Sequence, residues 1–129
     1  DMLDAIEQVG LSERLETLKD GMDTLLASSG YPLSIGEVME LKLANALLSR
    51  PRILVLSQLF DLMPIGKLVG VLRKLKASGT TVLLCTGRPE AITLDGWFWL
   101  GRDRQQRFSS LAEFQAFLTA RRMADADPA

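Results

Sequence analysis

Apolar residues recur at helical spacing through the first part of the chain. Leu3, Ile6 and Val9 lie three residues apart, which places them on one face of a helix, and Gly10 follows as a stop signal. Ser12 is a typical N-cap residue and predicts a second short helix. A loop of small residues and proline follows over 27–32. The N-terminal third is therefore predicted to be helical.

A longer helix is predicted directly after this loop. Ser34 and Glu37 have the spacing of a capping box, in which each side chain accepts a hydrogen bond from the backbone of the other residue. The helix should end near Ser49, because Pro51 disfavours a helical conformation in the residue before it. Its apolar face comprises Val38, Leu41, Ala44 and Leu48.

Two short apolar runs, over 53–56 and 80–85, flank a third amphipathic helix. Continuous apolar runs of this length are typical of parallel strands that are covered on both faces. Strand, helix and strand together predict a βαβ unit with a right-handed crossover. The apolar stripe of the helix comprises Ile65, Leu68, Val69, Leu72 and Leu75. Its basic residues lie off that stripe and indicate a solvated face: Lys67, Arg73, Lys74 and Lys76.

The last third predicts a hairpin and a helix. Residues 97–100 and 105–108 flank Gly101 and its polar neighbours, which is typical of a hairpin. Ser110 and Glu113 are a second capping-box candidate, and the chain beyond Arg122 is expected to fray. We therefore predict an α/β fold with a partial, mainly parallel sheet. Its parts are a helical segment over 1–50, an α/β core over 51–122 and a flexible tail over 123–129.

Composition limits the kinds of catalytic and binding site that the chain can contain. The 129 residues fit one compact domain, and a net charge of −1 argues against a generally basic nucleic-acid binder. The chain has no histidine, which excludes Ser-His-Asp catalysis and histidine metal sites within it. A single cysteine, Cys85, excludes an internal disulfide. Trp97 and Trp99 lie close to several arginines, but two tryptophans at this spacing on a strand are more often packing residues, and we predict no nucleic-acid partner.

Several short motifs follow one another along the chain: 20–24, the pentapeptide 33–37, a helix that ends at 49–51, the strand 53–56 with Ser57 and Gln58, and the segment 80–89. Their order and spacing resemble the C-terminal half of an ABC transporter ATPase domain of the exporter type. The resemblance runs from about Val9 to Leu118. It implies a partial P-loop NTPase-like sheet.

The pentapeptide is Leu33-Ser34-Ile35-Gly36-Glu37, where the family has Leu-Ser-Gly-Gly-Gln. The resemblance implies that this signature motif contacts the γ-phosphate of ATP held by a partner domain, since free N–H groups at a helix start favour an anion. Here Ile35 replaces a glycine and Glu37 places a carboxylate near the anion site. The alternative is that Ser34 and Glu37 only cap the helix.

The other functional positions of the family have also lost their polar groups. The family's Walker B strand ends in an aspartate for Mg²⁺ and a glutamate as general base, but this chain has Ser57 and Gln58 there. The family's switch histidine corresponds to Gly87, and the D-loop corresponds to 61–64, without a match at its first or last position. The hydrolytic site is therefore predicted to be disabled, with no metal site.

The resemblance implies a degenerate ATP-binding domain from a membrane export system. Its partners would be an intact ABC ATPase domain and a transmembrane domain, and it would lie in the cytoplasm at the inner face of the membrane. No phosphate-binding loop of the form G-x-x-x-x-G-K-[ST] occurs in the chain, so ATP and Mg²⁺ are expected only in a complete assembly. The alternative is a non-enzymatic module that kept the fold and self-associates. An unrelated α/β enzyme is the weakest interpretation, because the strand ends carry no carboxylate pair.

Overall fold

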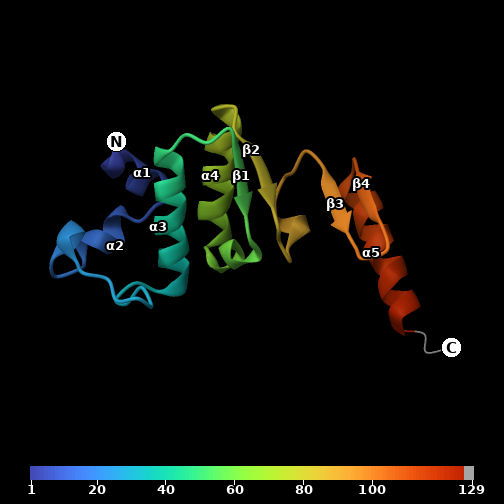
Figure 1. The fold of residues 1–129 in the computed structure, drawn as a ribbon, viewed down its shortest axis with the longest axis horizontal. Coiled ribbons are helices and arrows are strands. Elements are labelled where there is room, and N and C mark those ends of the chain that lie inside the picture. The colour runs from blue at the N-terminus through green and yellow to red at the C-terminus, as the bar shows by residue number, and fades with distance from the viewer. Residues whose placement is uncertain (127–129) are drawn as a thin grey trace. The chain divides into compact units, whose positions relative to one another are not determined.

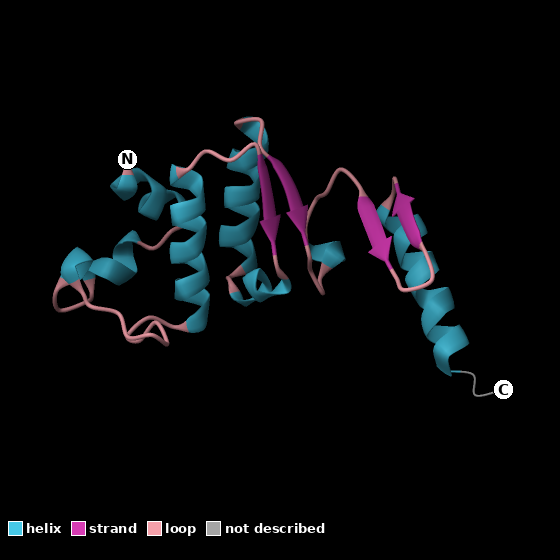
Figure 2. Cartoon of the chain, viewed as in Figure 1, coloured by secondary structure: helices cyan, strands magenta, loops and turns pink. Residues whose placement is uncertain are grey.

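The structure, a computed structural model, describes residues 1–126 and has a mixed α/β fold (Figures 1 and 2). The chain divides into two compact units, residues 1–87 and 88–129. The boundary predicted at residue 50, between a helical and an α/β segment, lies inside the first unit. None of the helices described between residues 1 and 126 combines the length and apolarity that crossing a membrane requires.

The first unit begins with helices. They are α1 (Met2–Gln8), α2 (Ser12–Glu16), the 3-10 turn η1 (Gly21–Asp23) and α3 (Ile35–Leu48). Helix α1 packs on α3, and the apolar residues between them are buried, among them Ile6, Val9, Leu11 and Leu43. The expected cap at Ser12 is wrong by one residue: Leu11 is the N-cap of α2 and makes no side-chain capping bond. The apolar Leu11 is fully buried, so packing fixes the start of this helix.

The βαβ unit that the sequence predicts is confirmed. Strand β1 (Ile53–Leu56) pairs in parallel with β2 (Thr81–Leu84), and Leu56 lies opposite Leu84. The 3-10 turn η2 (Gln58–Leu62) and helix α4 (Ile65–Ala77) connect the strands. Helix α4 packs on the sheet through buried Leu68, Val71 and Leu75. This pair is the whole parallel sheet of the described chain.

The expectation that both faces of this sheet are covered is wrong for the described residues. Ile53 and Val55 are 65% and 64% exposed, and Leu83 on the neighbouring strand is 53% exposed. Side chains alternate along a strand, so these residues share the face away from Leu56, which is buried. A helix covers only the face against which it packs, and α4 is on one side. We call Ile53, Val55 and Leu83 the open sheet face.

Lys67 is not part of a solvated basic face. Its ammonium group lies 3.1 Å from both carboxylate oxygens of Glu40 on α3 and donates a hydrogen bond to the Gly10 carbonyl at 2.8 Å. Glu40 is 1% exposed, and a buried carboxylate is stable only when it is paired. Lys67 therefore joins α4 to α3 and to the turn that follows α1.

The second unit is the predicted hairpin with its helix. Strand β3 (Trp97–Leu100) pairs antiparallel with β4 (Gln105–Phe108) after the turn η3 (Pro89–Ala91). Helix α5 (Leu111–Ala126) packs on the hairpin through Phe114 and Phe117. Trp99 packs edge-on against Phe117 with 5.6 Å between ring centroids. Helix α5 continues four residues past Arg122, so 123–126 of the expected tail are helical, and 127–129 lie outside the described residues.

Candidate functional site

The positions of Ser57, Gln58 and Gly87 are brought together by the parallel strands. Ser57 directly follows β1, and the register of the sheet places the end of β1 beside the end of β2. The Cys85 amide continues the pairing by donating to the Leu56 carbonyl at 2.9 Å. A Cβ atom on Gly87 would lie 3.0 Å from the Gln58 side-chain nitrogen. We call these residues, with Asp61 and Thr86, the strand-end site.

Asp61 is the residue of this site that sequence reasoning missed. Its Oδ1 accepts a hydrogen bond from the Thr86 hydroxyl at 2.7 Å, and its Oδ2 accepts one from the Gly87 amide at 2.8 Å. The carboxylate therefore ties the segment after β1 to the segment after β2. The one signal in the sequence is a carboxylate a few residues after an apolar strand, at the first position of the segment that corresponds to the D-loop.

The segment 33–37 lies against the same region. Leu33 is buried and Ile35 is 64% exposed, at the start of α3. A Cβ atom on Gly36 would lie 2.8 Å from the carbonyl oxygen of Leu62, the last residue of η2. That distance is shorter than a Cβ contact allows, so glycine is needed there for α3 to pack against η2. Packing alone is thus sufficient to explain Gly36.

The capping box predicted from the sequence is confirmed. Ser34 Oγ accepts a hydrogen bond from the Glu37 amide at 3.2 Å, and Glu37 Oε2 accepts one from the Ser34 amide at 2.8 Å. Two of the N–H groups that could face an anion at this helix start are thereby already bonded. The capping interpretation of Ser34 and Glu37 accounts for both side chains.

Glu37 is also held by a cation. The Arg14 Nε donates to Glu37 Oε1 at 3.1 Å, and the same guanidinium donates to the Pro32 carbonyl at 3.1 Å. Partial burial opposes ionisation, but the Ser34 amide and the Arg14 guanidinium outweigh it and hold the pKa of Glu37 below its ordinary value of 4.5. Glu37 is therefore ionised at neutral pH. Its charge would oppose a phosphate that approaches the start of α3.

The strand-end site does not fit a magnesium ion. Ser57 and Gln58 offer a neutral hydroxyl and a neutral amide, whereas Mg²⁺ prefers carboxylate oxygens. Both oxygens of Asp61 accept the hydrogen bonds described above. Across residues 1–126, no cluster of three or more acidic, cysteine or histidine side chains could hold a metal.

No protein-family model matches the chain. The chain is 27% identical over 93 residues to the Mating factor M secretion protein mam1 of Schizosaccharomyces pombe. The matched segment covers 72% of this chain and 7% of that protein. It is 34% identical over 58 residues, or 45% of its length, to the ABC-type transporter fsqE of Aspergillus fumigatus and to the uncharacterised ABC transporter ATP-binding protein YwjA of Bacillus subtilis. Those matches span 4% and 10% of the two relatives. The chain is thus similar, at low identity, to segments of one secretion protein and of two ABC transport proteins, and it matches only a small part of each.

Proposed function

We propose that this chain is the C-terminal part of an ABC-type ATP-binding domain of a membrane export system, and that it takes part in a dimer interface without hydrolysing ATP. The observation that carries the proposal is the strand-end site: the counterparts of two Walker B positions and of the switch histidine lie together at the ends of two parallel strands. Ligand sites of parallel sheets lie at this edge.

The chemistry of the strand-end site supports the absence of hydrolysis. The Gln58 amide cannot accept a proton from an attacking water at neutral pH, and Gly87 has no side chain to contact a phosphate. Ser57 cannot replace a charged oxygen ligand. Because the donor set does not fit Mg²⁺, the proposal assigns no catalytic step to this chain. ATP and Mg²⁺ would belong to a complete assembly.

In that assembly the partners would be an intact ABC ATPase domain and a transmembrane domain, at the cytoplasmic face of a membrane. The segment 33–37 would face the partner's nucleotide. With Ile35 and the charged Glu37 in this segment, we expect its contact with phosphate to be weaker than that of a Leu-Ser-Gly-Gly-Gln sequence.

The test mixes the 129-residue chain with an ABC ATPase domain whose hydrolytic site is intact, with and without ATP and Mg²⁺. Sedimentation should show association that depends on nucleotide, and the turnover of the intact domain should change, while the chain alone releases no phosphate. Glu37→Gln should strengthen the association because it removes the negative charge, whereas Glu7→Gln, an exposed control on α1, should not. If nucleotide changes neither association nor turnover, the proposed function is wrong.

A second function, an interaction module, is favoured by the open sheet face. Three exposed aliphatic residues on adjacent strands are an unusual surface for a chain that acts alone. This interpretation predicts self-association that depends on protein concentration and not on nucleotide. Val55→Thr should weaken that self-association while it preserves the branched shape that suits a strand.

A further inference from the structure

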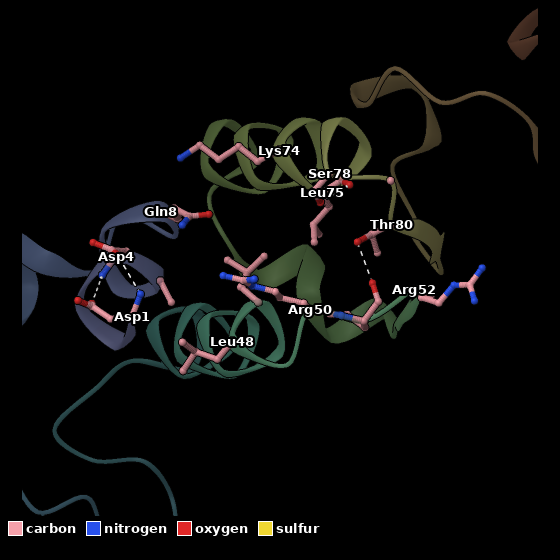
Figure 3. Close-up of a pocket in the computed structure, with 14 residues that line it drawn as sticks. Asp1, Asp4, Gln8, Leu48, Arg50, Arg52, Lys74, Leu75, Ser78 and Thr80 are labelled. Carbon is pink, nitrogen blue, oxygen red and sulfur yellow. Dashed lines mark hydrogen bonds and ion pairs between the residues drawn. The ribbon is translucent and has the colours of Figure 1, made fainter.

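A cavity of about 640 Å³ lies at the opposite end of the first unit from the strand-end site (Figure 3). It is lined by residues from α1, the end of α3, the segment 50–52, the end of α4 and the turn that precedes β2. Arg52 and Thr80 lie immediately before the two strands, so the cavity is at their amino ends. A volume of this size is in the range of sites for small molecules.

Two cations from different parts of the chain line this cavity. Figure 3 shows the side chains of Arg50 and Lys74 extending toward the side of the cavity where Gln8 of α1 lies, whereas Arg52 points away from it. Within residues 1–126, the side chains of Arg50 and Lys74 form no ion pair. A guanidinium, an ammonium and a carboxamide on one side of a cavity are donors that together suit an oxyanion.

The acidic residues of the cavity form no ion pair with these cations within residues 1–126. Asp1 is the N-cap of α1 and Asp4 lies in its first turn, and the two are bonded to each other: the Asp4 amide donates to Asp1 Oδ1 at 3.1 Å, and the Asp1 nitrogen donates to Asp4 Oδ2 at 2.7 Å. Their carboxylates therefore have local partners. The cavity is basic where α3 and α4 end and acidic at the start of α1, whereas Gln8 is the last residue of that helix.

The backbone of Arg50 provides an independent observation. Arg50 is the one non-glycine residue with a positive φ among those described, at 46°. It lies just after the C-cap of α3, where glycine is the residue that adopts this conformation without strain. Strain at a single residue is a reason to look for a functional role of its side chain. Here that side chain is the guanidinium that enters the cavity.

We propose that this cavity binds a small molecule that carries a phosphate group and an apolar body. The phosphate lies between Arg50 and Lys74, since both donate charge-assisted hydrogen bonds. The apolar body contacts the aliphatic side chains of the lining, which include Ala5, Leu47 and Leu48. This site is independent of the proposed ATP-dependent interface, because it shares no residue with the strand-end site or with segment 33–37.

The test titrates the isotope-labelled 129-residue chain with inorganic phosphate and with phenyl phosphate at constant pH and ionic strength, followed by NMR. Saturable shifts are expected for amides around 8, 50–52 and 74–80, with phenyl phosphate binding more tightly than inorganic phosphate. The proposal would be overturned if the shifts spread over all basic segments or did not saturate. It would also be overturned if phenyl phosphate bound no more tightly than inorganic phosphate.

Matched variants separate this site from general charge attraction. Lys74→Gln should weaken phenyl phosphate binding roughly tenfold, because it removes one charge-assisted hydrogen bond. Arg73→Gln, which removes the neighbouring cation outside the cavity, should leave the affinity unchanged. Arg50→Gly should unfold at the same or a higher temperature, since glycine accepts the left-handed backbone. It should nevertheless bind phenyl phosphate at least roughly tenfold more weakly, because it too removes a charge-assisted hydrogen bond. Equal losses of phenyl phosphate affinity in Arg73→Gln and Lys74→Gln would show that the cavity is not the phosphate-binding site.

Discussion

The buried pair of Glu40 and Lys67 allows the sharpest test of the fold. In Lys67→Met the aliphatic stem is replaced by a side chain of similar length, but the Glu40 carboxylate and the Gly10 carbonyl lose their common donor. Breaking a fully buried pair costs about 3–5 kcal/mol, and an exposed pair contributes about 0–1 kcal/mol. The Glu40 side chain is 2% exposed but that of Lys67 is 38% exposed, so we expect an intermediate loss of about 2–3 kcal/mol.

Urea unfolding followed by far-UV circular dichroism measures this loss. With an unfolding slope of about 1–2 kcal/mol per molar urea, the midpoint should fall by roughly 1–3 M. Hydrogen exchange of amides in α3 should accelerate accordingly, which assigns the change to the first unit. The control is Arg73→Met on the same helix, which removes an exposed cation and should change stability by less than about 0.5 kcal/mol.

A double variant tests the physical reason for the loss. If the cost arises from an unpaired buried carboxylate, Glu40→Leu combined with Lys67→Met should recover most of the lost stability, because no buried charge remains. A double variant as unstable as Lys67→Met would refute this reasoning. A loss for Lys67→Met no larger than that of the Arg73 control would show that the pair does not join the helices.

Three further predictions concern the candidate site. Gly36→Ala should lower the free energy of unfolding by about 1–3 kcal/mol, because its Cβ would collide with the Leu62 carbonyl. The control Gly66→Ala on α4, whose Cβ would meet no atom within 4 Å, should raise the free energy of unfolding by about 0.5–1 kcal/mol, and chemical unfolding of both variants measures the difference. Because the folded-state pKa of Glu37 is lowered, its ionised form stabilises the fold above its ordinary pKa of 4.5, and this stability is lost as the pH falls through the lower folded-state pKa. Thermal unfolding between pH 3 and pH 7, a range of about four units, should therefore be less pH-dependent for Glu37→Gln, and identical profiles would contradict the assignment. Asp61→Ala should accelerate hydrogen exchange in the segment after β2 while the amides of α1 keep their protection, since the carboxylate holds that segment through two hydrogen bonds.

The sequence predicted the local structure well where the signal lies within a few residues. The capping box of Ser34 and Glu37 depends on two residues one helical turn apart, and the structure confirms it. The bounds of strands 53–56, 97–100 and 105–108 also agree with the structure, because apolar runs and turn residues define them. Ser12 was misjudged because burial of the preceding Leu11 decided where α2 starts.

The candidate site could be predicted only in part. Ser57 and Gly87 follow two neighbouring parallel strands, so their proximity could be inferred from the βαβ pattern. The role of Asp61 could not, since its partners lie 25 and 26 residues away in the chain. The need for glycine at position 36 likewise depends on the Leu62 carbonyl, and no pattern near Gly36 reveals that contact.

The sequence alone determined the elements and their order, since helical periodicity, capping and strand length act over a few neighbouring residues. It also determined that the strand-end site lacks histidine and paired carboxylates. Tertiary structure decided which charges are buried, which face of the sheet stays open and which side chains meet around the cavity. Glu40 and Lys67 are 27 residues apart, and only the packing of α3 against the start of α4 made one of them a buried charge and the other its partner.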